Sequence, residues 1–226
     1  MQRLSNQAFG VRWEDDLAAV LRRPPSVALD VGANAGQTAR RLLERFPGLH
    51  VYSFEPHPEA LTKLQALAAR EPSLEVIAAA ASDGGGELEL VLTPFNQHST
   101  VTRAPRPGER TVNVATTRLD AFCMERGIRQ VSLLKLDVEG HEIAALKGAM
   151  GLLNERRVDA ILVECEFEQN AEQPHGNFFD IHHLVAEHDY RVVAFYPGGV
   201  DGNGWQWGDV LYRLRSDGPT LEGPFR

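Results

Sequence analysis

The residues whose types most favour chemistry lie in the segment 131–141. Lys135, Asp137 and Glu139 interrupt an otherwise apolar run there, and His141 follows two positions later. By the two-residue period of a strand, the first three share one face while the chain stays extended. A buried lysine or carboxylate needs a partner, because burying an unpaired charge costs several kcal/mol. We therefore expect these side chains to pair or to open into a polar cleft, where a carboxylate or neutral imidazole could accept a proton.

A glycine-rich turn, Asp30–Gly36, is the second chemical feature. It joins an apolar run to a helical pattern, and its glycines allow a tight turn with close approach to a ligand at a helix N-terminus. The spacing departs from Gly-x-Gly-x-x-Gly, and the Asp30 carboxylate would repel a pyrophosphate. That carboxylate could instead engage an ammonium group, directly or through water. The turn favours S-adenosylmethionine over NAD, with a site formed by Asp30, Gly32, Asn34 and Gly36.

An acid follows one strand later. Glu55, in Phe54-Glu55-Pro56, closes the next apolar run about 20 residues after the turn, where an acid is placed to bind ribose hydroxyls. We expect Ser82 and Asp83, after the third strand, to lie near the adenine.

The elements that must position these residues alternate between strand and helix. Such alternation predicts a mostly parallel sheet with helices on both faces, the Rossmann-like α/β class. Expected strands are 27–31, 50–54, 74–79, 131–138, 158–165, 191–195 and 209–214, and expected helices are 13–21, 38–46, 58–69, 119–126, 142–153 and 178–188. Two further strands, 87–92 and 111–116, predict a small inserted hairpin around a polar loop, 93–110, which we expect to cover an acceptor site. We expect one domain over 1–226, with 1–23 as an N-terminal helical extension.

Composition narrows the classes of partner. The chain has 226 residues, 43% of them hydrophobic, and a formal net charge of −8, which argues against a broad nucleic-acid surface. No apolar stretch approaches a membrane span, and residues 1–10 do not form a signal peptide. Cys123 and Cys165 lie far apart, without disulfide or metal spacing, which favours reduced thiols and a cytoplasmic location.

Several polar positions leave alternatives open. Glu164, Glu166 and Glu168 share a face and could line an acceptor site or hold a divalent cation, although carboxylates alone assign no metal. Glu164 could also pair with Lys135. Trp205 and Trp207 fit either an aromatic platform for a sugar ring or packing beside the last strand. His98 is a further candidate base.

These motifs together resemble the FkbM family of methyltransferases. The resemblance covers roughly residues 27–166 and rests on Asp30–Gly36, Phe54–Pro56, Ala80–Asp83, Leu119-Asp120, Leu134–Glu142 and Leu146–Ala149. It implies a seven-stranded sheet with one antiparallel strand, S-adenosylmethionine as methyl donor, and O-methylation of sugars, polysaccharides or polyketide-type natural products. His141 stands where the family often has a small residue.

The expected activity is thus methyl transfer to a hydroxyl of a carbohydrate or small-molecule acceptor. Asp137 would hold the methionine part of the cofactor and the acceptor, and Glu139 or His141 would take the proton. The alternatives are an NAD-dependent oxidoreductase and a non-catalytic nucleotide-binding module.

Overall fold

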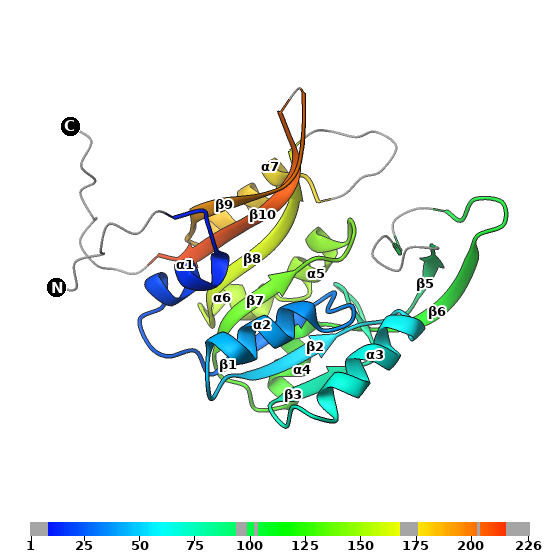
Figure 1. The fold of residues 1–226 in the computed structure, drawn as a ribbon, viewed down its shortest axis with the longest axis horizontal. Helices are drawn as coiled ribbons and strands as arrows, with labels where there is room; N and C mark the ends of the chain where they lie inside the picture. Colours follow the sequence, from blue (N-terminus) through cyan, green and yellow to red (C-terminus); the bar gives the residue numbers. More distant parts are fainter. Residues whose placement is uncertain (1–8, 94–98, 102–103, 168–175, 203, 216–226) are drawn as a thin grey trace.

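A seven-stranded sheet forms the centre of the molecule. The computed structural model describes residues 9–93, 99–101, 104–167, 176–202 and 204–215 (Figure 1). The strand order is β3-β2-β1-β7-β8-β10-β9, and β10 alone runs antiparallel to its neighbours. This confirms the mostly parallel sheet with one reversed strand. The strands are β1 (Val27–Val31), β2 (His50–Phe54), β3 (Leu74–Ile77), β7 (Val131–Leu136), β8 (Val158–Glu166), β9 (Tyr190–Asp201) and β10 (Gly204–Leu214).

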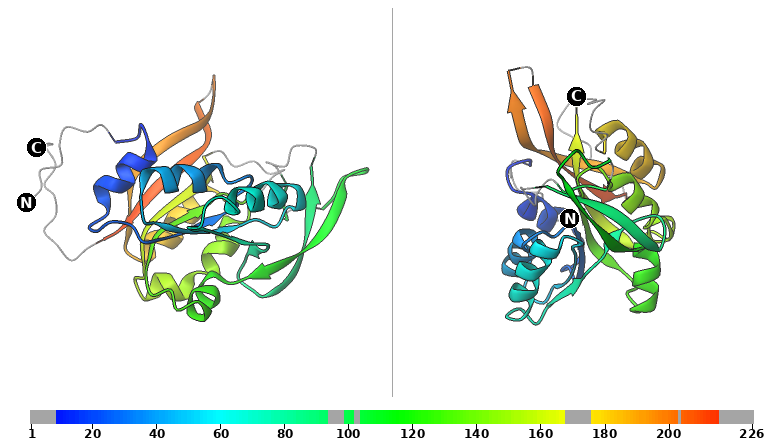
Figure 2. Two further views of the ribbon diagram at one scale, coloured as in Figure 1. Left: turned by 60° about the horizontal axis from the view of Figure 1, so that its bottom comes forward. Right: turned by 90° about the vertical axis from the view of Figure 1, so that its right-hand side faces the viewer.

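Helices cover both faces of the sheet, as expected for strands that are apolar on both sides. The right-hand view of Figure 2 shows the two helical layers on opposite sides. One hydrophobic cluster lies under α1 (Trp13–Val20), α2 (Gln37–Arg45) and α3 (Pro58–Ala68). The other lies under α4 (Leu119–Glu125), α5 (Glu142–Lys147), α6 (Met150–Asn154) and α7 (Phe178–Glu187). None of the helices in the described ranges is long and apolar enough to cross a membrane.

A small second sheet carries the predicted hairpin. Strands β5 (Gly86–Leu92) and β6 (Arg110–Thr117) pair antiparallel, and the short β4 (Ala80–Ala81) joins β6 in parallel. Figure 1 shows this hairpin projecting at the right of the view, beyond α3.

The expected single helix 142–153 is wrong, because two helices, α5 and α6, occupy this segment. The break lies at Gly148, which packs so closely against the third-strand segment that a Cβ there would come within 2.0 Å of the Ser82 carbonyl oxygen. The Gly148 carbonyl accepts a hydrogen bond from the backbone N–H of Asp120 (2.9 Å). The Asp120 carboxylate in turn accepts one from Gly151 N–H (3.3 Å). Tertiary contacts of Gly148 and Gly151 therefore interrupt the expected helix between α5 and α6.

The site is positioned by the reversal of strand order at β1. The chain runs from β1 outward through β2 to β3, and then returns to place β7 on the other side of β1. Connections leave such a point in opposite directions, so a crevice opens at the carboxyl ends of the two central strands. The glycine-rich turn after β1 and the polar segment after β7 both lie at this crevice.

Gly32 fits this junction only because it lacks a side chain. Its φ is +78°, and an added Cβ would lie 1.7 Å from the carbonyl oxygen of Asp137. We expect Gly32→Ala to lower the free energy of unfolding by about 3 kcal/mol or more, from left-handed strain plus overlap with backbone. Gly85→Ala is the control, since nothing lies within 4 Å of its added Cβ. Equal denaturant midpoints for the two variants would contradict this account.

Candidate active site

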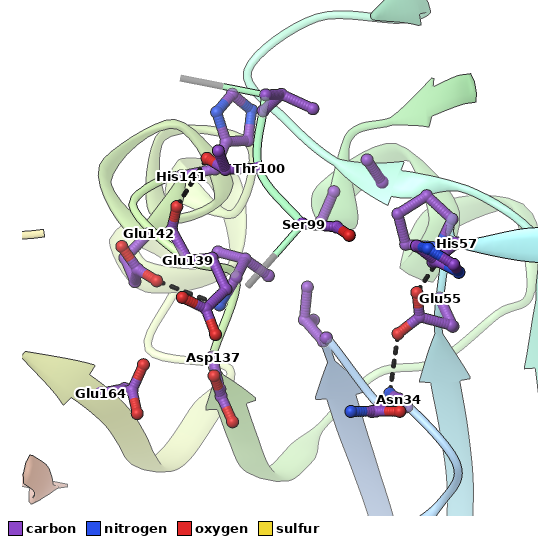
Figure 3. A pocket seen from close by; sticks show the side chains of 18 of the residues that line it. Asn34, Glu55, His57, Ser99, Thr100, Asp137, Glu139, His141, Glu142 and Glu164 are labelled. Carbon is purple, nitrogen blue, oxygen red and sulfur yellow. Dashed lines mark hydrogen bonds between the residues drawn. The ribbon is translucent and has the colours of Figure 1, made fainter. Parts of the chain in front are cut away.

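A cavity of about 970 Å³ opens at the carboxyl ends of the central strands. Its size suits a cofactor together with part of an acceptor, since ligand sites commonly span about 300–1,000 Å³. Figure 3 shows Asn34, Glu55 and His57 on one side of it, with Asp137, Glu139 and Glu164 on the other. The inserted segment contributes Thr93, Ser99, Thr100, Val101, Arg106 and Glu109 to its wall.

Glu55 is held in place on the first side. One carboxylate oxygen accepts a hydrogen bond from Asn34 N–H (2.7 Å) and the other from His57 N–H (2.7 Å). The residue is 6% exposed, and burial raises the pKa of its carboxyl group although the two amides oppose the shift. Each oxygen keeps a further lone pair, so this oriented carboxylate can still accept hydrogen bonds from a diol.

The amide groups of Gly32, Ala33 and Gly36 in the glycine-rich turn are already used within the protein. Gly32 and Ala33 donate to the Phe54 carbonyl (3.0 and 3.1 Å), and Gly36 donates to the Ala33 carbonyl (2.8 Å). Gly36 has φ +86°, and its missing Cβ leaves room for the Leu67 side chain. The glycines therefore serve turn geometry and packing, and their N–H groups are not available to a phosphate.

Asp30 lies below the cavity instead of in its wall. It is fully buried, accepts a hydrogen bond from Ser53 Oγ (3.2 Å), and has one oxygen 3.7 Å from Lys135 Nζ. Lys135 Nζ also bonds Asp137 Oδ2 (3.0 Å) and the Gly32 carbonyl (3.2 Å). Asp30 therefore does not line the cavity itself, and Lys135, which does, links it to Asp137. Lys135 pairs with two aspartates and not with Glu164.

Burial alone would lower the pKa of Lys135, but Asp137 and Asp30 outweigh it and the pKa is raised. Burial raises the pKa of Asp30, against the effect of Lys135. The pair is an internal charge link between β1 and the end of β7, since each group compensates the desolvation of the other.

Ser82 and Asp83 are not in the wall of the cavity. Its wall there is formed by Ala79, Ala80 and Ala81, with Pro56 and His57 from the second strand end. Asp83 is exposed, and the Ser82 hydroxyl lies 3.1 Å from Nε2 of His141. The strand turns into the second sheet earlier than expected, which carries Ser82 past the crevice.

The turn after β7 is fixed from two directions. Glu139 has φ +53° and Gly140 φ +98°, so the chain bends there and does not stay extended. Glu142 holds this bend: its carboxylate accepts hydrogen bonds from the N–H groups of Val138 (3.0 Å) and Gly140 (3.2 Å), and also from Gly176 (3.1 Å). Sequence reasoning assigned Glu142 no role, although it ends the most specific motif of the segment.

The inserted segment supplies the other support. Thr100 Oγ1 donates to the carbonyl oxygen of Glu139 (2.8 Å). His141 is half-buried at the N-terminus of α5 and lines the cavity, and burial lowers the pKa of its imidazole.

Three carboxylates converge where the turn meets β8. Oxygen atoms of Asp137, Glu139 and Glu164 all lie within 4.8 Å of one another (Figure 3). Burial and repulsion from Asp137 raise the pKa of Glu139 to about 8, and burial with repulsion from Asp137 and Glu139 raises that of Glu164 to about 9. Oxygen ligands so placed could hold a divalent cation or share protons. Sequence analysis assigned no metal, and that assignment stays a prediction.

The remaining sequence candidates divide between the cavity and other places. Glu166 and Trp207 line the cavity beside Glu164. His98 and Glu168 lie outside the described residues.

Crowding of these carboxylates should lower stability at alkaline pH. A carboxyl group whose pKa is raised by folding stabilises the protein fully below its unfolded pKa, and that contribution is lost as the pH rises through the folded value. We expect Glu164→Gln to raise the melting temperature at pH 8, by about 2–4 °C for each kcal/mol of repulsion that the substitution removes. At pH 4 the melting temperature of the variant should differ little from that of the parent chain. Thermal unfolding at both pH values measures this.

Glu87→Gln, on the exposed part of β5, is the matched control and should show no pH-dependent gain. A Glu164→Gln variant that is destabilised equally at both pH values would show that the carboxylate mainly makes favourable contacts.

Solved structures with the same fold bind methyl donors or their products. Magnesium protoporphyrin IX methyltransferase ChlM from Synechocystis PCC 6803, with bound S-adenosylmethionine, superposes with a TM-score of 0.53 at 11% identity, over 90% of this chain and 76% of that chain. M. capricolum TrmK in complex with S-adenosylhomocysteine gives 0.51 at 8% identity, over 92% and 68%. At these identities the likeness shows the Rossmann-like fold.

Relatives found by sequence point to a particular family, which the fold alone does not. The chain is 26% identical to 2-O-methyltransferase NoeI of Sinorhizobium fredii, over 94% of this chain and 92% of that protein. It is 27% identical to 31-O-demethyl-FK506 methyltransferase FkbM of Streptomyces tacrolimicus, over 56% and 60%. It is 25% identical to hexuronic acid methyltransferase AglP of Haloferax volcanii, over 68% and 63%.

The Methyltransferase FkbM domain matches residues 30–192, which include the glycine-rich turn, Glu55 and the whole carboxylate cluster. This chain belongs to the FkbM family of S-adenosylmethionine-dependent methyltransferases.

Proposed function

We propose that the chain transfers a methyl group from S-adenosylmethionine to a hydroxyl oxygen of a sugar, polysaccharide or natural-product acceptor. The observation that carries this proposal is one cavity that joins an oriented Glu55 to the cluster of Asp137, Glu139 and Glu164. The printed names of the relatives, two O-methyltransferases and a hexuronic acid methyltransferase, support the acceptor class.

The residues on the first side fit this cofactor. Glu55 would accept hydrogen bonds from the ribose hydroxyls, held by Asn34 N–H. The wall of Ala79, Ala80 and Ala81 would pack on the adenine. Asp137, oriented by Lys135, would bind the methionine ammonium group. NAD fits less well, because the turn lacks the Gly-x-Gly-x-x-Gly spacing and the N–H groups of Gly32, Ala33 and Gly36 are already bonded inside the protein.

The residues on the second side fit an oxygen acceptor. When bound, the cofactor supplies a methyl group on a positively charged sulfur, which the acceptor oxygen displaces in line. Asp137 and Glu164 would orient the acceptor hydroxyl, and much of the rate would come from this positioning. The hydroxyl proton would pass to a carboxylate oxygen of Glu139 as the new O–C bond forms, and from there to solvent.

Glu139 is favoured over His141 as the base by geometry. Its carboxylate lies in the cluster, and its backbone is fixed by Thr100. The Nε2 atom of His141 instead faces the Ser82 hydroxyl, away from the three carboxylates. His141 would then shape the cavity wall.

Two observations bear on the compartment and on the acceptor class. Cys123 and Cys165 are both buried free thiols, in keeping with a reducing cytoplasm. The acidic chain favours a carbohydrate or small-molecule acceptor over nucleic acid.

The cofactor assignment predicts a binding defect. Glu55→Gln keeps the shape of the side chain but loses its charge and one of its two acceptor oxygens. We therefore expect the binding free energy of S-adenosylmethionine to become less favourable by about 1–3 kcal/mol. Calorimetric titration measures this, with NAD titrated in parallel. Glu44→Gln, on the exposed face of α2, should bind normally. Unchanged affinity in a folded Glu55→Gln protein, or tighter binding of NAD, would overturn the assignment.

The base assignment predicts a turnover defect. We expect Glu139→Gln to lower kcat about 10²–10⁴-fold while cofactor affinity stays within about twofold, because a base acts only as the proton leaves. His141→Asn should lower kcat much less. The reverse order of the two effects would make His141 the base.

The pH profile provides a second readout of the same assignment. A base must be ionised, and the pKa of Glu139 is raised to about 8, so kcat/KM for the acceptor should rise between pH 6 and 8. Positive charge beside the carboxylate shifts that midpoint downward when the cofactor is bound. Glu139→Gln should remove the rise.

A further inference from the structure

We propose that Trp207 is the stacking platform for an uncharged sugar ring, in an acceptor subsite whose hydroxyl-binding groups are Glu164 and Glu166. The inference rests on the proposed function and names the acceptor class and the residues that select it.

The backbone of β9 supports one face of the Trp207 indole. A Cβ added at Gly198 would come within 2.0 Å of Cζ3 of the indole, and one at Gly199 within 2.4 Å of its Nε1. The six-membered ring therefore lies on Gly198 and the five-membered ring on Gly199. No other residue type could stand at either position without displacing the ring.

The rest of the indole remains available. Trp207 is 43% exposed and lines the cavity, whereas Tyr212 on the same strand is fully buried. A purely structural role, in which the indole covers two glycines of an outer strand, explains the face that lies on β9. That role does not explain why the rest of a large aromatic side chain stays exposed at the wall of the cavity. Aromatic rings combine a flat apolar face with little conformational entropy to lose, which suits the C–H face of a pyranose.

Hydroxyl-binding groups lie beside the platform. Trp207 is the cross-strand partner of Glu166, and Asp209 that of Glu164, so all four side chains share one face of the sheet. Glu164 lies about 7 Å along β8 from Glu166 and borders Asp137 and Glu139. A ring stacked on Trp207 would present its hydroxyls to Glu166 and Glu164, and the hydroxyl on its far side to Glu139.

Charge in this part of the cavity selects against anionic rings. Glu139, Glu164 and Glu166 all line it, while Lys135 is already engaged by two aspartates. The inserted segment adds Arg106 and Glu109, whose charges balance. An acceptor carboxylate would repel each of these carboxyl groups that is ionised, including Glu139 when it accepts the proton, in a partly desolvated site, which is unfavourable.

Equilibrium binding tests the platform without requiring turnover. The full chain is loaded with S-adenosylhomocysteine and titrated with methyl glycosides of glucose, galactose, mannose, fucose and N-acetylglucosamine, and with methyl glucuronide and galacturonide. We expect at least one neutral glycoside to bind at least tenfold more tightly than either uronide. Trp207→Ala should weaken that binding at least tenfold, and Trp207→Phe should keep most of it.

Three controls separate the outcomes. Phe179→Ala removes a side chain that is 67% exposed on α7 and does not line the cavity, and should bind like the parent chain. Affinity for S-adenosylhomocysteine and the melting temperature show whether Trp207→Ala is folded. Glu164→Gln combined with Glu166→Gln should reduce the preference for neutral rings over uronides.

Two results would overturn the proposal: no neutral glycoside binds, or a neutral glycoside binds a folded Trp207→Ala protein as tightly as the parent chain. A uronide that binds as well as the neutral ring would overturn the charge selection. Failure of the proposed methyl transfer would show separately, as absent binding of S-adenosylhomocysteine, and the glycoside titration could still be read on the unloaded chain.

Discussion

The ammonium group of Lys135 is the interaction on which the site depends. It is 5% exposed and contacts Asp30 from β1, Asp137 from the end of β7 and the carbonyl of Gly32 from the turn between them. Neither Asp30 nor Lys135 could be buried alone, because Lys135 offsets the desolvation of Asp30, and Asp137 and Asp30 together offset that of Lys135. The two central strands must therefore meet in register before the site is complete. Gly32 is required at the same junction, since the Asp137 carbonyl occupies the place of its side chain.

Beyond this link the site holds more negative than positive charge. Glu139 and Glu164 lie beside Asp137, and burial raises the pKa of Asp209 on the next strand to about 6. Such crowding opposes folding at neutral pH, so it needs a compensating use. A ligand with positive charge on sulfur and nitrogen would relieve the repulsion, and one carboxylate kept near its ionisation point would accept a proton. The same groups that weaken the fold would then bind the cofactor and assist the reaction.

Sequence reasoning succeeded where local pattern decides structure. Apolar periodicity and turn residues predicted the mostly parallel sheet and the hairpin at β5 and β6, whereas the reversed strand was implied by the family resemblance. It failed where tertiary contacts decide. The break at Gly148 depends on contact with the Ser82 carbonyl, and the burial of Asp30 depends on the strand that supplies Lys135. The role of Glu142 depends on amide groups before it and on Gly176 far beyond it, which no spacing rule reveals.

The two halves of the cavity are built differently, and this bears on how acceptors are selected. The half with Glu55 and the glycine turn is closed mainly by hydrogen bonds among residues 31–57, and its outside support comes from the central strand β7 through Lys135 and Asp137. The other half draws on β8, β10 and the inserted segment, which are separate in sequence and free to change independently. Thr100 connects that segment to the carbonyl of Glu139. A change in the acceptor-facing loop would therefore reach the position of the proposed base, so this contact would couple acceptor fit to proton transfer.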